Sequence, residues 1–80
     1  MRILLVEDDD MIGESVMAGL ETEGHAIDWV RDGNSALLAL NTTPYSLVIL
    51  DLGLPGKDGL QVLKEMRGRR DPTPVLVTTA

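Results

Sequence analysis

The stretch Val48–Leu60, VILDLGLPGKDGL, runs from consecutive apolar residues directly into an ionisable acid, Asp51. Burying a lone carboxylate is costly, so a strand with a purely structural role has little reason to end on one. A turn signal follows at once, because glycine and proline fill most of Gly53–Gly56. This stretch therefore predicts a buried strand whose end presents Asp51 for a chemical task.

The rest of the chain alternates between short apolar runs and segments of helical periodicity. Strands are predicted at Ile3–Val6, His25–Val30, Ser46–Leu50 and Pro74–Thr78, the second at a sheet edge because it is less apolar. Helices are predicted to begin at capping aspartates, Asp9 or Asp10, Asp32 and Asp58, and to end near Gly24, Asn41–Pro44 and Gly68. Such alternation predicts an α/β fold, with a parallel sheet, right-handed crossovers and helices on both faces.

Apolar spacing within the predicted helices indicates which faces pack inward. The inward positions are Ile12, Val16, Leu20, Ala36, Leu37, Leu40, Leu60, Leu63 and Met66, with Met11 and Met17 also assigned to the core. Trp29 is interpreted as packing on the edge strand. His25 is the only histidine and lies at a strand start away from the acids, so no metal or phosphate role is assigned to it.

The composition fits one small globular domain of 80 residues. Because there is no cysteine, a disulfide framework and thiolate metal sites are excluded, and a cytoplasmic location is expected. A net charge of −6, with Trp29 and Tyr45 as the only aromatic residues, argues against direct nucleic-acid binding by this segment. The apolar runs are too short to span a bilayer, so no membrane partner is expected.

A run of four acids, Glu7–Asp10, follows the first predicted strand, and Asp51 follows the apolar run of the third. Ligands of open parallel sheets bind at the carboxyl ends of strands, where neighbouring strands would crowd these carboxylates together. Like charges at close range require protons or a cation, and oxygen ligands without His or Cys favour Mg²⁺. The run alone fits a solvated loop with a helix cap equally well. Asp51 at the end of a second strand favours the cation site.

Several of these elements together resemble the receiver domain of two-component response regulators. They are Val6–Asp9, the apolar strand ending in Asp51, Leu54–Pro55 with Asp58–Gly59, and Thr79–Ala80, in order along the whole chain. Leu50–Leu60 is most similar to receivers of the OmpR/PhoB type, whose full-length members are winged-helix transcription factors. The resemblance implies a flavodoxin-like, doubly wound parallel sheet of strand order 2-1-3-4-5.

The resemblance also implies a role for each residue of the site. Asp51 would accept a phosphoryl group from the phosphohistidine of a sensor histidine kinase, without the chain being an enzyme. Mg²⁺ would be held by Asp8 directly, by Glu7 mostly through water, by Asp51, and by the backbone carbonyl of Gly53. Thr79 would supply the switch hydroxyl. Thr78 has the same chemistry, and only the Thr–Ala pair of the family favours Thr79.

The chain departs from the family pattern after Thr79–Ala80, where receivers continue with a fourth helix, a fifth strand and a fifth helix. The expected domain is therefore a C-terminally incomplete receiver over residues 1–80, with no output domain. The lysine that the family carries on the fifth strand has no counterpart, because Lys57 and Lys64 lie in the third loop and helix. The fourth strand would become an apolar edge, which predicts self-association, most simply as a homodimer.

Two other function classes share features with this sequence. Haloacid-dehalogenase-like phosphatases also place a nucleophilic Asp at a strand end, but they need a second Asp two residues later, where this chain has Gly53. Enzymatic turnover is therefore not expected. The other class is a receiver-like interaction or dimerisation module that is not phosphorylated. The missing lysine favours that class, and the acids at positions 7, 8 and 51 argue against it.

Overall fold

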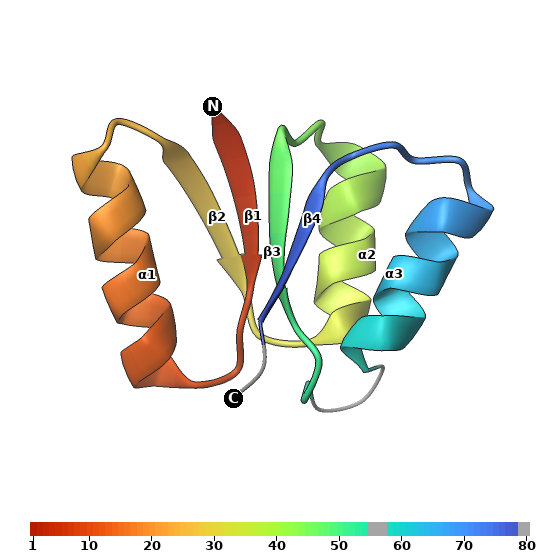
Figure 1. Ribbon diagram of the computed structural model, residues 1–80, viewed down its shortest axis with the longest axis horizontal. Coiled ribbons are helices and arrows are strands. Elements are labelled where there is room, and N and C mark those ends of the chain that lie inside the picture. The colour runs from red at the N-terminus through yellow and green to blue at the C-terminus, as the bar shows by residue number, and fades with distance from the viewer. Residues whose placement is uncertain (55–57, 79–80) are drawn as a thin grey trace.

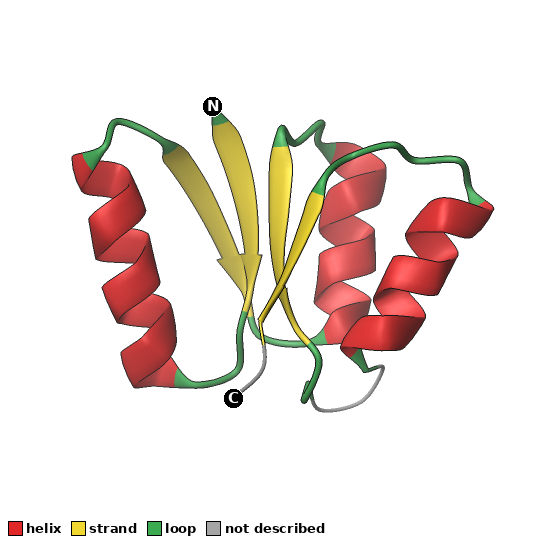
Figure 2. Ribbon diagram, viewed as in Figure 1, coloured by secondary structure: helices red, strands yellow, loops and turns green. Residues whose placement is uncertain are grey.

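Four strands alternate with three helices in the computed structural model, which describes residues 1–54 and 58–78 (Figures 1 and 2). The strands are β1 (Arg2–Val6), β2 (Ala26–Val30), β3 (Leu47–Asp51) and β4 (Val75–Thr78). The helices are α1 (Asp10–Thr22), α2 (Gly33–Thr42) and α3 (Gly59–Gly68). Every predicted element is therefore present, and the strand boundaries agree with the prediction to within one residue. No helix within the described residues is long and apolar enough to cross a membrane.

The sheet is parallel throughout and has the strand order β2-β1-β3-β4, which confirms the predicted doubly wound topology. The central strands β1 and β3 are buried along almost their whole length, as their continuous apolar runs predict. Val6 of β1 is paired with Leu50 of β3. The next residues along are Glu7, just after β1, and Asp51, the last residue of β3, so they lie at the same level of the sheet.

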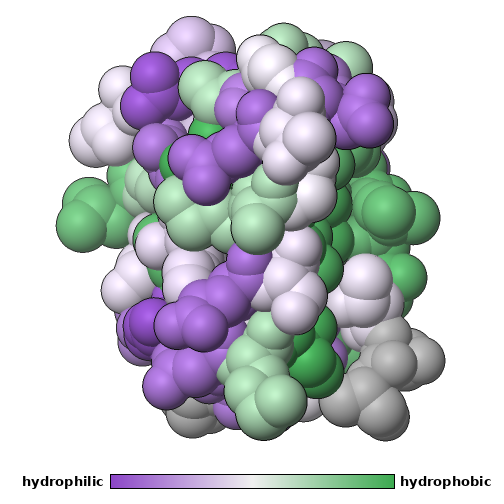
Figure 3. Space-filling view, turned by 90° about the vertical axis from the view of Figure 1, so that its left-hand side faces the viewer, coloured by the Kyte–Doolittle hydropathy of each residue, from purple (hydrophilic) through white to green (hydrophobic). Residues whose placement is uncertain are grey.

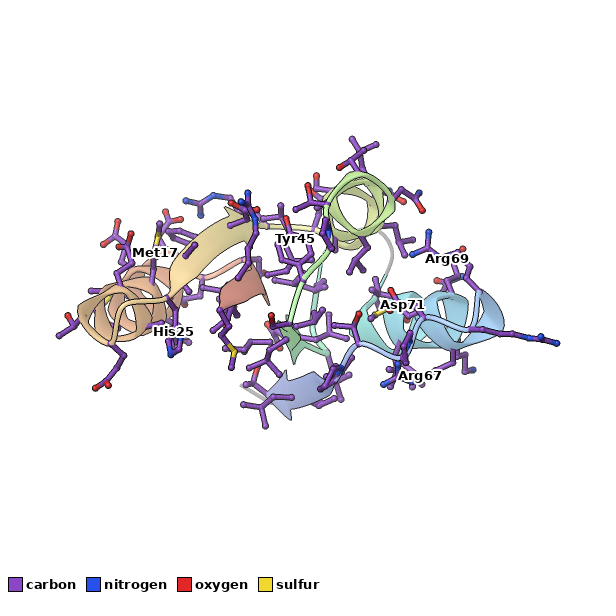
Figure 4. The ribbon with its side chains drawn as sticks, turned by 90° about the horizontal axis from the view of Figure 1, so that it is seen from above. Met17, His25, Tyr45, Arg67, Arg69 and Asp71 are labelled. Atoms are coloured by element: carbon purple, nitrogen blue, oxygen red, sulfur yellow. The ribbon has the colours of Figure 1, made fainter. Side chains whose placement is uncertain are left out.

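Helices cover both faces of the sheet, with α1 on one face and α2 and α3 on the other (Figure 4). Alternate residues of the central strands supply the two halves of the core. The half under α2 and α3 contains Leu4, Val6, Val48, Leu50, Ala36, Val62 and Met66, and the half under α1 contains Ile3, Leu5 and Ile49 with Val16 and Leu20 packed against them. This packing fixes the positions of the strand ends.

Three inward positions predicted from helical spacing are wrong. Leu60 is 51% exposed, and Val62 occupies the buried face of α3 instead. The reason is that α3 packs through Gly59, Val62 and Met66, which share one face because each lies about one helical turn after the last. Met11 and Ile12 are 81% and 43% exposed, because they precede the stripe through which α1 meets the sheet.

The aspartates predicted to cap the helices do so. The side chains of Asp9, Asp32 and Asp58 accept hydrogen bonds from the backbone N–H groups of Ile12 (3.0 Å), Ser35 (2.7 Å) and Gln61 (2.8 Å). The choice left open between Asp9 and Asp10 is thus settled in favour of Asp9. Asp9 and Asp58 therefore have a structural role that accounts for their presence.

Candidate functional site

An acidic pocket of about 550 Å³ lies at the carboxyl ends of β1 and β3. It is lined by Glu7, Asp8, Asp9, Ile12, Asp51, Leu52 and Gly53. The strands put it there because β1 and β3 are adjacent and paired as far as Val6 and Leu50, the residues before Glu7 and Asp51. The pocket therefore lies where ligands bind in open parallel sheets.

Three carboxylates converge in this pocket. Oxygen atoms of Glu7, Asp8 and Asp51 lie within 4.8 Å of one another. Glu7 and Asp51 are only 5% and 3% exposed, whereas Asp8, which lines the same pocket, is exposed. The structure thus brings together the three acids that the sequence predicted as metal ligands.

The carboxylates are held by backbone groups of the loops that carry them. Glu7 Oε2 accepts a hydrogen bond from the N–H of Asp9 (3.1 Å), and Asp51 Oδ1 accepts one from the N–H of Gly53 (3.1 Å). Burial raises the pKa of Glu7 and the nearby charge of Asp51 raises it further, while the Asp9 N–H acts in the opposite direction. The ionised form of Glu7 is therefore disfavoured in this pocket.

This donor set fits a hard divalent cation. All three side chains offer oxygen, two of them are buried, and their separation allows one ion to contact them together. Gly53 lines the same pocket, as expected for a residue predicted to offer its carbonyl oxygen. The contact between that carbonyl and a metal stays a prediction.

Gly59 places the start of α3 directly against the backbone of Asp51. A Cβ atom at position 59 would lie 2.3 Å from the carbonyl oxygen of Asp51 and 2.8 Å from Cα of Leu52. No side chain fits in that space, so glycine is required for the helix to approach the strand end this closely. Asp58–Gly59 was part of the sequence resemblance, but this steric role was not recognised there.

Trp29 contacts the backbone of Glu7, a contact that sequence reasoning missed. Its indole Nε1–H donates a hydrogen bond to the backbone carbonyl of Glu7 (2.9 Å), in addition to packing on the edge strand β2. The pairing of Leu5 with Trp29 in the β1–β2 register brings the indole to this level. A large aromatic residue near the end of a strand beside the acidic run was the signal that could have revealed it.

The remaining predicted positions are placed as follows. Thr79, the predicted switch hydroxyl, and the turn at residues 55–57 lie outside the described residues. Thr78 is paired with Asp51 across β3 and β4, and its hydroxyl is 3.4 Å from the carbonyl of Leu50. His25 lies at the opposite end of the sheet, with Nδ1 3.3 Å from the N-terminal amine, and does not belong to the pocket.

A doubly wound parallel sheet with carboxylates grouped at its central strand ends defines a flavodoxin-like α/β domain with a candidate cation site. The chain matches the response regulator receiver domain family over residues 3–80, and it belongs to that family.

Two curated relatives illustrate the similarity in sequence. The chain is 49% identical over 80 residues to the transcriptional regulatory protein QseB of Haemophilus influenzae and 48% identical to the response regulator protein PmrA of Pseudomonas aeruginosa. Each alignment covers 100% of this chain and 36% of the relative. The chain therefore spans about a third of the length of these relatives, which are regulators of the OmpR/PhoB type.

Solved structures of response regulators match the backbone of this chain closely over 99% of its length. The Francisella response regulator 1452 receiver domain gives a TM-score of 0.95 at 30% identity, covering 99% of this chain and 65% of that one. TrrA of Thermotoga maritima, in complex with Mg(2+)-BeF, gives a TM-score of 0.93 at 38% identity, and the match covers 99% of this chain and 69% of that one. TrrA in complex with the histidine kinase ThkA gives a TM-score of 0.91 at 38% identity, and the match covers 99% of this chain and 68% of that one.

Proposed function

We propose that this chain is the phosphoacceptor module of a two-component response regulator, with Asp51 as the acceptor. The observation that carries the proposal is the convergence of Glu7, Asp8 and Asp51 within 4.8 Å at the ends of two buried strands. Asp51 is the acid at the end of β3 and is almost fully buried, so its carboxylate is fixed in direction. The phosphoryl donor is the phosphohistidine of a sensor histidine kinase, the partner class named in the structure of TrrA with ThkA.

The transfer needs little chemistry from the protein. A carboxylate oxygen of Asp51 attacks phosphorus, the P–N bond to the histidine breaks as the P–O bond forms, and the imidazole nitrogen keeps the electron pair. The N–H of Gly53 orients Asp51 through Oδ1, and Asp8 and Glu7 are the residues that would hold Mg²⁺. The bound cation supplies positive charge that offsets the negative charge gathered around the transferred group.

The product is proposed to be a stored acyl phosphate, so the chain is not an enzyme that turns over substrate. A phosphatase mechanism of the haloacid-dehalogenase kind needs an acid two residues after the nucleophile, and the residue there is Gly53. Gly53 contributes an N–H to Asp51 but has no side chain that could protonate a leaving group. The site is therefore suited to accepting a phosphoryl group and not to rapid hydrolysis.

The consequence of phosphorylation is proposed to lie in a longer parent protein. Because the chain spans 36% of relatives described as transcriptional regulatory and response regulator proteins, we infer that the parent couples this module to a DNA-binding output domain in the cytoplasm. The module itself is not proposed to contact nucleic acid, since its net charge is −6.

The experiment that tests the acceptor assignment is phosphorylation of the purified chain with acetyl phosphate, with and without Mg²⁺. One phosphoryl group is expected, on Asp51, and only when Mg²⁺ is present. Asp51→Asn should abolish labelling, whereas Asp58→Asn, which alters only a helix cap, should retain it. Labelling located on Asp8 or Asp58 would contradict the assignment. The complete absence of labelling would favour an interaction module that is not phosphorylated.

Self-association is proposed for the exposed side of β4. Leu76 and Val77 on this strand are 55% and 41% exposed, and Figure 3 shows hydrophobic residues gathered along its right-hand margin, the side on which β4 lies. An apolar edge strand without a charged residue in its middle can pair with the same strand of a second copy. Sedimentation at micromolar concentration should detect a dimer. Leu76→Lys should dissociate it, and Leu38→Lys, at an exposed leucine on α2, should not.

A further inference from the structure

The backbone of Glu7 is held on both sides by β2. Its N–H donates to the carbonyl of Val30 (3.0 Å), and its own carbonyl accepts the hydrogen bond from the indole N–H of Trp29 (2.9 Å). The first bond continues the β1–β2 ladder beyond Val6, the last paired residue of β1. The second bond comes from a side chain, so it is a feature of this sequence and not of the sheet.

The indole cannot shift without moving its neighbours. A Cβ atom at Gly13 of α1 would lie 2.0 Å from Cζ2 of Trp29, so the ring occupies the space that any other residue would fill. The guanidinium of Arg31 lies 4.1 Å from the centre of the ring on which it stacks. Arg31 also forms an ion pair with Asp10, the first residue of α1. The ring is therefore held between the start of α1 and the end of β2.

This arrangement controls the direction in which the chain leaves β1. The peptide bond is planar, so fixing the carbonyl of Glu7 also fixes the peptide plane that joins Glu7 to Asp8. Those residues carry two of the three converging carboxylates. We propose that Trp29 is a positioning residue for the metal-binding acids, acting through its N–H on the Glu7 carbonyl. The inference rests on the proposed function, because it requires Glu7 and Asp8 to bind a cation.

A packing role and a positioning role make different demands on Trp29. Packing against Gly13 and Arg31 uses the faces and edge of the ring, whereas positioning uses the single polar atom. Trp29→Phe keeps an aromatic ring and removes the N–H. Tyr45→Phe is the matched control, because it removes one O–H, the donor to Asp28 (2.6 Å), just before the start of β3 at the opposite end of the sheet.

The test measures Mn²⁺ affinity of the 80-residue chain by counting free Mn²⁺ with electron paramagnetic resonance. Trp29→Phe should weaken binding about tenfold, the lower end of the effect of removing a group that orients a metal ligand. Tyr45→Phe should leave the affinity unchanged, although both variants lower the urea midpoint. Gly13→Ala, which displaces the indole while retaining its N–H, should weaken binding in the same direction as Trp29→Phe.

A second readout uses the wild-type chain alone. Trp29 is its single tryptophan, and its N–H is bonded to the residue that carries a metal ligand. Saturating Mg²⁺ should therefore change the fluorescence of Trp29, and Asp8→Asn should abolish that change. Wild-type Mn²⁺ binding together with unchanged affinity in Trp29→Phe would overturn this inference alone. Absence of Mn²⁺ binding by the wild-type chain would overturn the proposed function and the inference with it.

Discussion

Glu7→Gln tests the idea that the acidic pocket is maintained at the expense of folding stability. Gln has the shape of Glu and can still accept the hydrogen bond from the N–H of Asp9, but it carries no charge. Carboxylate oxygens of Glu7 and Asp51 lie within 4.8 Å of each other, and both residues are buried. In the absence of a cation, removing one of these charges should stabilise the folded chain.

The size of the effect follows from the separation of the charges. Two unit charges at the 4.8 Å limit of that separation repel by about 3.5 kcal/mol at an effective dielectric constant of about 20. Water reaches the pocket beside the exposed Asp8 and screens part of this repulsion, so we expect a gain of about 1–2 kcal/mol at pH 7. That gain is a large fraction of the total stability of a small domain.

The assay is urea unfolding at pH 7 in the presence of a chelator, with midpoint and slope compared between wild type and Glu7→Gln. Glu14→Gln is the matched control, because it removes the same charge from an exposed position on α1. Added Mg²⁺ should raise the midpoint of the wild type more than that of Glu7→Gln, since the variant has lost a ligand. A Glu7→Gln chain no more stable than Glu14→Gln in the chelator would refute the reasoning.

Two further outcomes are expected. Asp8→Asn should abolish Mn²⁺ binding, whereas Asp10→Asn should leave it nearly intact, because Asp10 is paired with Arg31 outside the group of three carboxylates. Calorimetric titration of both variants with Mn²⁺ checks this prediction. Equal losses of affinity in the two variants would indicate a diffuse acidic patch. The hydrogen bond from the Tyr45 O–H lowers the pKa of Asp28 below its ordinary value of 3.8. The stabilisation that this hydrogen bond contributes is therefore present above that pH and is lost as the pH falls through the lowered pKa. Tyr45→Phe should therefore reduce the free energy of unfolding by about 1 kcal/mol at pH 7 and by progressively less in acid. Urea midpoints across a pH series measure this. A difference between wild type and variant that stays constant with pH would contradict the role of ionised Asp28.

Most of the fold followed from local signals in the sequence. The continuous apolar runs of β1 and β3 gave the buried central strands, and the capping aspartates gave the helix starts. Parallel strands with helices between them then required the ends of β1 and β3 to lie at one end of the sheet. The meeting of Glu7, Asp8 and Asp51 was predictable for the same reason, because it depends on topology and not on side-chain detail.

What could not be predicted depended on contacts between elements. Leu60 and Val62 both fit an inward helical stripe, and only the close approach of Gly59 to the backbone of Asp51 decides which one is buried. Similarly, the bond from Trp29 to Glu7 requires the β1–β2 register and the absence of a side chain at Gly13. Hydrophobic periodicity contains neither piece of information.

Within the described residues, Glu7 and Asp51 of the acidic pocket accept hydrogen bonds but form no ion pair. Glu7 and Asp51 each accept a backbone N–H from the residue two positions later, and no buried side-chain polar atom of the described residues lacks a hydrogen bond. Arginine ion pairs in the described part of the chain are formed with Asp28, Asp10 and Asp71, all outside the three converging carboxylates. Neutral donors hold the acids in place without removing their charge, so the repulsion that remains is relieved when a cation binds. The repulsion that Glu7→Gln should remove is therefore also relieved when Mg²⁺ binds in this pocket.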